Sequence, residues 1–364
     1  MPRKGMRRKC SVEAQELAML ISKLNSLRGR LPQFMVYQPA TYTMLSQALA
    51  THERHSNTPF LLSTESFDTH VHVFDPKLGP YAAGRAYTPE DAPLQKLLAL
   101  NQSLARDNNN TTLVLVQPSP YKNDCTVMMH CLRELRDRGI RSFGIAVLDL
   151  DTITDAQLNE MHALGVRGIR LNFQADGKDV DITHLISLLN RTADRIRYLP
   201  SWAIQLFVPG WTWDLLHDAV RELHVKVIAD HLGGLRGTSK LPSELQSTPM
   251  SQPGFRSLLS LARQSIVYVK ISGLYRMSDH SASTFDDLQP IVQAMAREIP
   301  DQVIWGSDWP HTGDGHNRVK RSIESKEPFR MIDNHAIIQR LHDWMGDDAY
   351  WKMMVDNPGR LYID

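Results

Sequence analysis

Cysteine is scarce in this 364-residue chain, which contains only Cys10, Cys125 and Cys131. Three thiols cannot build a disulfide scaffold, and the absence of a CxxC pair excludes a zinc or redox site of that type. Unpaired thiols are typical of a reducing compartment, so we expect a cytoplasmic protein.

An excess of charge of one sign is also lacking, because 41 lysines and arginines balance 40 acidic residues to a net charge of +1. The chain as a whole therefore has no long-range attraction for nucleic acid or for an anionic membrane. No apolar run reaches the length of a membrane span. The run at 17–21 is also too short for the apolar core of a secretory signal. We expect neither nucleic acid nor a membrane as a partner, whereas a homo-oligomer is compatible with the sequence.

The first nine residues contain five basic side chains, as a mitochondrial transit peptide would. Such peptides are poor in acids, however, and Glu13 and Glu16 follow closely. Apolar residues at helical spacing predict a helix over 11–29. We interpret residues 1–66 as a partly flexible, helical or irregular N-terminal extension, and mitochondrial targeting stays the alternative to a cytoplasmic location.

From residue 67 onward, short β-rich runs alternate with amphipathic helical stretches. The predicted strands cover 67–74, 112–118, 141–148, 166–173, 202–208, 226–232, 267–273 and 303–309. The predicted helices cover 93–106, 125–138, 155–164, 183–197, 212–223, 255–264, 284–299 and 335–355. Eight such units match a (β/α)8 TIM-type barrel over 67–364. A doubly wound sheet is the competing fold, but the glycine-rich turn that it needs after its first strand is missing at 75–80.

Polar side chains recur where the predicted strands end. Asp68, His70 and His72 alternate along the first strand, so they share one face, which is the barrel interior. Two imidazoles at adjacent inward positions can bind one metal ion or polarise one carbonyl oxygen.

The later strands add more polar groups of this kind. They are Arg170 and Asn172, Asp230 and His231, Lys270 and Ser272 with Arg276 just beyond, and the run from Ser307 to His311. Each alone could be a structural ion pair or a core histidine, because buried charges are costly unless paired. Together at the carboxyl ends of barrel strands, where such folds place their active sites, they indicate a functional site.

Five segments, in this order, resemble the motifs of the amidohydrolase superfamily, in its amidohydrolase-related branch and most closely its dicarboxylate lactonases. They are DTHVHVF at 68–74, GIRLNF at 168–173, ADHLG at 229–233, WGSDWPH at 305–311 and NPGRLY at 357–362. The resemblance covers about 67–364 and leaves out the extension. It implies a (β/α)8 barrel and a hydrolase acting on a small molecule.

The resemblance also implies roles for individual residues. Asp308 would be the general base that activates water, and His70, His72 and His231 would surround the substrate carbonyl and stabilise the oxyanion. Substrate contacts would come from Arg170, Arg276, Tyr87, Ser119 and His311. A bidentate guanidinium suits a carboxylate, so Arg170 and Arg276 would bind that group.

The pattern departs from the metal-binding members of the superfamily on the fifth strand, which reads AIQLFV at 203–208 and has no histidine. His70, His72 and Asp308 could still hold zinc with an open position. Arg170 beside them opposes a divalent cation by Coulomb repulsion, so we favour a metal-free site without a cofactor. A zinc-dependent hydrolase or decarboxylase is the alternative, and a non-catalytic binding protein is the alternative from another class.

The substrate is expected to be a lactone or related C–O ester that carries a carboxylate. An acid, Asp176, stands near the position of a second arginine in the dicarboxylate lactonases. One carboxylate clamp would then be lost, and we expect a more apolar pocket with one charged anchor, which suits a larger or less charged substrate.

Overall fold

The computed structural model describes residues 60–173, 180–280, 284–313 and 322–363. The chain separates into two units, Met1–Thr58 and Pro59–Asp364. The helix predicted over 11–29 lies outside the described residues, as does Asp176.

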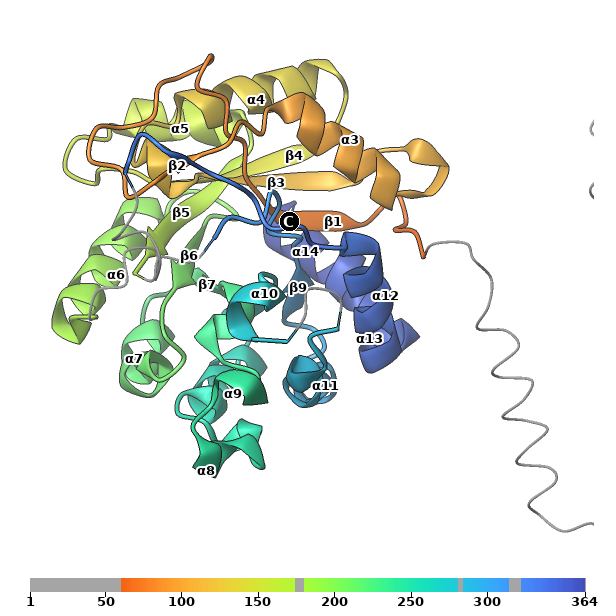
Figure 1. The fold of residues 1–364 in the computed structure, drawn as a ribbon. Helices are drawn as coiled ribbons and strands as arrows, with labels where there is room; N and C mark the ends of the chain where they lie inside the picture. Colours follow the sequence, from red (N-terminus) through yellow and green to blue (C-terminus); the bar gives the residue numbers. More distant parts are fainter. Residues whose placement is uncertain (1–59, 174–179, 281–283, 314–321, 364) are drawn as a thin grey trace, which may run out of the picture. The chain divides into compact units, whose positions relative to one another are not determined.

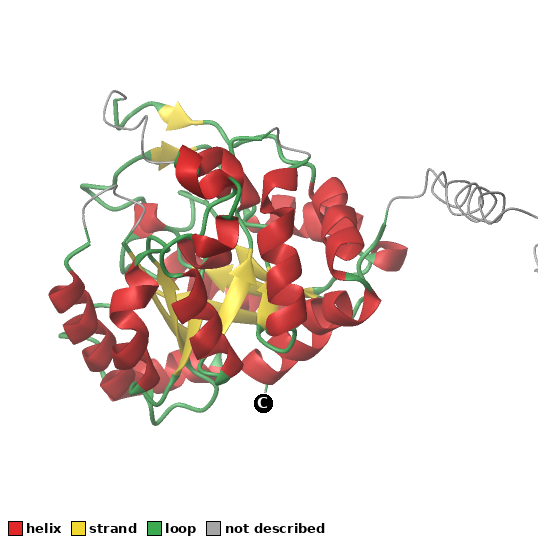
Figure 2. Cartoon of the chain, turned by 90° about the horizontal axis from the view of Figure 1, so that it is seen from below, coloured by secondary structure: helices red, strands yellow, loops and turns green. Residues whose placement is uncertain are grey.

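Eight parallel strands form the centre of the second unit and run in the order β1-β3-β4-β5-β6-β7-β8-β9 (Figures 1 and 2). They are β1 (Phe67–Val71), β3 (Thr112–Val116), β4 (Ser142–Ala146), β5 (Val166–Asn172), β6 (Ala203–Phe207), β7 (Lys226–Ala229), β8 (Val267–Ile271) and β9 (Val303–Trp305). The sheet closes just past β9, where His72 N donates to Trp309 O and Asp308 N donates to His70 O, each at 2.9 Å. The predicted (β/α)8 barrel and all eight of its strands are confirmed.

Helices surround the strands, as Figure 2 shows. They are α3 (Leu94–Leu104), α4 (Thr126–Asp137), α5 (Asp155–Ala163), α6 (Ile182–Ile196), α7 (Thr212–Arg221), α8 (Ser243–Gln246), α9 (Phe255–Arg263), α10 (Leu274–Met277), α11 (Gln289–Glu298), α12 (Asn334–Met345), α13 (Asp347–Trp351) and α14 (Asn357–Tyr362). The region predicted as one helix over 335–355 is in fact divided, because Gly346 at φ +76° ends α12 and a π-helical turn, Lys352–Asp356, joins α13 to α14. No helix among the described residues is both long and apolar enough to cross a membrane.

The strands bury both of their faces, as parallel strands covered by helices do. On β3, Leu113 and Leu115 pack in the layer between strands and helices, whereas Val114 and Val116 belong to a separate cluster inside the barrel. Tyr362 of α14 joins that inner cluster and is fully buried. The interior is thus filled with apolar side chains apart from a polar group near the carboxyl ends of the strands.

Two features lie outside the eight-unit pattern. Residues 60–66 were predicted to belong to the extension. They contact α3, since Leu62 N donates to Leu104 O at 2.8 Å. Two short parallel strands, β2 (Thr88–Pro89) and β10 (Lys326–Glu327), pair with each other. This pair joins the segment after β1 to the segment after β9, next to Tyr87.

Candidate active site

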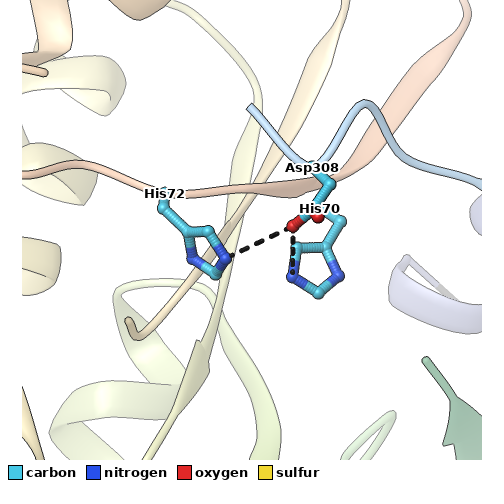
Figure 3. A group of neighbouring side chains, drawn as sticks. All are labelled: His70, His72 and Asp308. Atoms are coloured by element: carbon cyan, nitrogen blue, oxygen red, sulfur yellow. Dashed lines mark ion pairs between the residues drawn. The ribbon is translucent and has the colours of Figure 1, made fainter. Parts of the chain in front are cut away.

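The centre of the site is formed by the end of β1 and the segment that follows β9. His70 Nε2 and His72 Nε2 both lie 3.6 Å from the same oxygen, Asp308 Oδ1 (Figure 3). All three side chains are buried. Asp308 has φ +61°, and its backbone is fixed by the closure contact with His70 O.

The hydrogen bond at the other nitrogen of His72 determines what this ring offers to Asp308. His72 Nδ1 lies 2.7 Å from Val116 O. A carbonyl oxygen only accepts, so Nδ1 carries the proton and Nε2 of a neutral ring presents a lone pair. For His70 the choice is open, because Nδ1 lies 3.3 Å from the acceptor Asp230 Oδ1 and 3.5 Å from the donor Lys270 Nζ.

The second oxygen of Asp308 is held by two donors. Tyr275 donates its hydroxyl to Asp308 Oδ2 at 2.7 Å, and Arg276 donates Nε to the same atom at 2.8 Å. Arg276 also donates to Thr312 Oγ1 at 2.8 Å. These contacts orient the carboxylate so that Oδ1 faces the two histidines, and Oδ1 has no hydrogen-bond partner among the described residues.

Asp308 is held in its charged form. Burial opposes ionisation, but the charge of Arg276 and the adjacent imidazoles outweigh it and keep the pKa of Asp308 well below its usual value. The pKa of Arg276 is raised despite burial, because Asp308 stabilises the guanidinium. A carboxylate at the floor of a cavity, with one oxygen unsatisfied, is a suitable acceptor for a proton from water.

A second buried carboxylate, Asp230, lies beyond His70. Its oxygens face Arg170 Nε at 3.2 Å, Gln205 Nε2 at 2.9 Å and Lys270 Nζ at 3.5 Å. Lys270 is fully buried on β8 and also donates to Thr69 O at 2.9 Å and to Gln205 Oε1 at 2.8 Å. These contacts link β1, β5, β6 and β8 with the end of β7, and they support His70 from behind.

The charges of this group stabilise one another. Burial would raise the pKa of Asp230, but its contacts with His70, Lys270 and Arg170 outweigh burial and hold that pKa well below its usual value. Burial lowers the pKa of Lys270 to about 8, and the charge of Asp230 limits the fall. Buried ions of opposite sign that share hydrogen bonds are the arrangement in which such charges are tolerated.

His231 follows β7 and packs against His70. The rings of His70 and His231 lie 4.9 Å apart, and Phe207 packs edge-on against His231 at 4.5 Å between ring centroids. His231 Nδ1 lies 2.9 Å from Ser272 Oγ. Gly273, at φ +56°, leaves room for this ring, since a Cβ there would lie 2.6 Å from His231 Nδ1.

His231 and His311 are both buried in neutral form, and this predicts that the folded protein loses stability in mild acid. Burial lowers the pKa of His231 and of His311 to about 4. An unfolded histidine protonates near pH 6.5, so between pH 6.5 and 4 the unfolded state binds more protons and stability falls as the pH falls. From pH 7 to 5 we expect a loss of about 2 kcal/mol per histidine, offset by about 1 kcal/mol from Asp68, whose pKa burial raises to about 6.

Urea unfolding at pH 7, 6 and 5 measures this loss. The His231→Asn variant should show a shallower dependence on pH, by about the share of one histidine. A stability that is constant or rises from pH 7 to 5 would contradict the assignment of neutral, buried rings.

A cavity of about 540 Å³ opens above these groups. Most predicted site residues line it: His72, Tyr87, Ser119, Arg170, His231 and Arg276. His70 and Asp308 lie beneath its floor, in contact with His72. The structure does not bring His311 to the wall, because its ring is buried 3.3 Å from Asn334 Oδ1 and packs against Tyr275.

The wall of the cavity corrects the expectation of a more apolar pocket with one charged anchor. Four cations line it, namely Arg170, Arg236, Lys240 and Arg276. Two of them lie in the segment between β7 and α8, which the strand pattern left as a loop. The absence of an arginine near position 176 therefore does not make the pocket less positively charged, because other segments provide the cations.

The residues that hold the catalytic side chains in place were not predicted as such from the sequence. Lys270 and Asp230 were recognised as polar groups without a role, and Gln205 and Tyr275 were not recognised as part of the site. A lysine at the centre of the otherwise apolar strand VYVKI was a usable signal for an internal ion pair. The hydroxyl of Tyr275 had no comparable signal.

Two groups of side chains have the composition and spacing to hold a metal ion: His70, His72 and Asp308, and His70, Asp230 and His231. In each group the candidate ligand atoms lie within 4.8 Å of one another. In the first group two of these atoms, His70 Nε2 and Asp308 Oδ1, are buried without a hydrogen-bond partner among the described residues.

The model of the amidohydrolase family matches residues 67–362, which include every residue of this site. The chain belongs to the amidohydrolase family. The predicted membership is thereby confirmed, and the protein is a hydrolase rather than a non-catalytic binding protein.

Characterised relatives extend over almost the whole chain. A 4-sulfomuconolactone hydrolase from Rhizobium radiobacter is 29% identical over 330 residues, which are 89% of this chain and 98% of that protein. A 2-pyrone-4,6-dicarboxylate hydrolase from Comamonas testosteroni is 29% identical over 84% of this chain and 93% of that protein. An apo structure from Agrobacterium tumefaciens has the same fold, with a TM-score of 0.63, 20% identity, and coverage of 84% of this chain and 97% of the other.

Proposed function

We propose that this amidohydrolase opens a lactone, or a related C–O ester, of a carboxylate-bearing small molecule by metal-independent attack of water. The observation that supports the proposal is the unsatisfied Asp308 Oδ1, which faces two imidazole nitrogens beneath an open cavity. The names of the two characterised relatives, both lactone-type hydrolases, support the same reaction class.

Asp308 Oδ1 is the acceptor for the proton that water loses during attack. A water molecule that donates to Oδ1 and to the lone pair of His72 Nε2 would have its own lone pair left for the carbonyl carbon. The low pKa of Asp308 makes it a weak base, so proton transfer requires that the new oxyanion is stabilised at the same moment.

A donor for that oxyanion is provided by the cavity wall, where His231 lies beside His72. An imidazole N–H placed where the negative charge develops lowers the barrier more than it would in water. Arg170, on the same wall, is the residue that binds the substrate carboxylate. When the C–O bond of the ring breaks, the leaving oxygen takes a proton, which protonated Asp308 or His231 can supply.

Metal binding is the alternative, and the residues fit it. His70, His72 and Asp308 would hold a divalent cation, because three acceptor atoms converge and two of them lack a partner. A bound zinc ion would polarise the carbonyl and lower the pKa of a water ligand. One opposing observation is that β6, with the sequence AIQLF, provides no histidine. Another is the presence of two cations close by, Arg276 at 2.8 Å from Asp308 and Lys270 at 3.5 Å from His70.

Removal of metal by a chelator distinguishes the metal-independent mechanism from the metal-dependent one. We expect protein dialysed against EDTA, with less than about 0.1 zinc per chain by elemental analysis, to keep kcat/KM within twofold of the untreated enzyme. Added zinc should not increase the rate. Activity that falls with the metal content and returns on adding zinc would establish the metal-dependent alternative.

A panel of substrates tests the reaction class. The purified enzyme is assayed for ring opening on lactones and pyrones that carry a carboxylate, and on cyclic amides of the same ring size. Cyclic carboxylic acids of similar size are assayed for loss of CO2. Hydrolysis confined to the lactones supports the proposal, whereas release of CO2 from a carboxylic acid would indicate a decarboxylase.

A cytoplasmic location fits the state of the described thiols. Cys125 and Cys131 are free, and burial raises the pKa of each to about 12. Inert, unpaired thiols are what a reducing compartment permits. We therefore keep the cytoplasm as the proposed location.

A further inference from the structure

Three of the four cations on the cavity wall already have a carboxylate partner. The pairs are Arg170 Nε with Asp230 Oδ2 at 3.2 Å, Arg276 Nε with Asp308 Oδ2 at 2.8 Å and Lys240 Nζ with Asp279 Oδ1 at 3.3 Å. The fourth, Arg236, is exposed, and its guanidinium has no ion-pair or hydrogen-bond partner in the described part of the chain. Arg236 is therefore the one of these four cations whose charge is not offset by a carboxylate of the described residues.

The backbone of Arg236 is held by a buried side chain. Gln252 accepts from Arg236 N through Oε1 at 2.8 Å and donates Nε2 to Arg236 O at 3.1 Å. Only 6% of Gln252 is exposed, and its Nε2 also donates to Pro249 O at 2.8 Å. A glutamine that satisfies both backbone groups of one residue fixes the point from which that side chain extends.

The residues that follow are tied to the segment after β8. Gly237 N donates to Met277 O at 2.8 Å, and Ser239 N donates to Asp287 Oδ2 at 3.1 Å. Gly237 packs so closely on Asp287 that a Cβ there would lie 2.3 Å from Oδ2. Since the loop is ordered before any ligand arrives, binding at Arg236 costs little additional backbone entropy.

We propose that Arg236 binds a second anionic group of the substrate, a carboxylate or sulfonate, in addition to the carboxylate that Arg170 binds. This assignment rests on the proposed function, since it concerns the substrate of the same cavity. A planar guanidinium can form two parallel hydrogen bonds to either group. Selection for a dianion thus comes from the loop after β7, although the sequence lacks a second arginine in the segment after β5.

The test compares two substrates and four proteins. The substrates are 2-pyrone-4,6-dicarboxylate and 2-pyrone-6-carboxylate, which share the ring and differ by one carboxylate. The proteins are the wild type, Arg236→Gln, Arg236→Lys and a control, Arg256→Gln. Arg256 lies on α9, is exposed, does not line the cavity, and has no ion pair among the described residues.

For Arg236→Gln we expect the ratio of kcat/KM values, dicarboxylate over monocarboxylate, to fall about tenfold, mainly through KM of the dicarboxylate. Arg236→Lys should recover part of the ratio because it keeps the charge without the planar fork. Arg256→Gln should match the wild type. An unchanged ratio in Arg236→Gln, or an equal loss on both substrates, overturns the assignment.

Calorimetry with benzene-1,3-dicarboxylate and benzoate separates failure of this assignment from failure of the proposed reaction, because binding requires no hydrolysis. If the wild type opens neither pyrone but Arg236→Gln still weakens the dicarboxylate about tenfold relative to benzoate, the subsite stands and the reaction class is wrong. The wild type could instead open the pyrones but show no preference for the pyrone dicarboxylate over the pyrone monocarboxylate, and none for benzene-1,3-dicarboxylate over benzoate. In that case the proposed reaction is right and the second anion site is wrong.

Discussion

The Asp308→Asn variant should lose roughly 10³-fold in kcat, within the range that general-base catalysis contributes. Asparagine has nearly the same shape and can still accept hydrogen bonds from Tyr275 and Arg276 through its amide oxygen. It cannot take a proton from water, and it presents an N–H₂ group where Oδ1 now faces His72. The change therefore removes the chemistry and leaves the packing.

Single-turnover and steady-state rates on the best lactone of the panel measure this loss. A matched control is Asp356→Asn, which changes an exposed aspartate of the π-helical turn that does not line the cavity. Circular dichroism of both variants checks that the barrel is intact. An Asp308→Asn enzyme that retains kcat within tenfold of the wild type would show that another group activates the water.

The strand pattern and the polar strand ends were sufficient to predict the barrel and the centre of its site. Most of the strands are short runs rich in apolar residues, and helices between parallel strands allow few other folds. Period-two alternation then placed His70 and His72 on one inward face, and the order of strands placed Asp308 beside them. These conclusions depend on local patterns and topology, which the sequence displays directly.

Contacts between distant segments could not be predicted in the same way. Lys270 reaches Thr69 and Gln205 across the barrel, over separations of 201 and 65 residues. Which cation pairs with which carboxylate depends on side-chain conformations and not on spacing along a strand. For this reason Arg276, expected to contact substrate, proved to hold Asp308 as well.

The charge of the cavity wall shows the limit of comparing single positions. An acid near position 176 indicated a lost anchor, but Arg236 and Lys240 line the cavity from the segment after β7. Loops at the carboxyl ends of barrel strands vary in conformation, so a charge missing from one loop can be provided by another. Only the folded arrangement shows which loops share a wall.

The Asp230→Asn variant should lose about 3–5 kcal/mol of unfolding free energy, because the change leaves Lys270 and Arg170 as buried cations without a carboxylate. The side chains of Asp230 and Lys270 are both fully buried, so water cannot replace the lost partner. A matched control is Asp151→Asn, which breaks the exposed ion pair with Arg191 and should cost less than about 1 kcal/mol.

Adding Lys270→Met to Asp230→Asn tests the cause of this loss. If the cost arises from the uncompensated ammonium, its removal should return at least about 1 kcal/mol, so that the double variant is more stable than Asp230→Asn alone. Urea unfolding of the two single variants and the double variant gives the coupling energy directly. Additive losses would mean that Lys270 is held by Thr69 and Gln205 independently of Asp230, and the buried charges would then be two separate features of the barrel. A favourable coupling would instead show that a single charge network stabilises the barrel interior and, through Asp230, supports His70 behind the catalytic carboxylate.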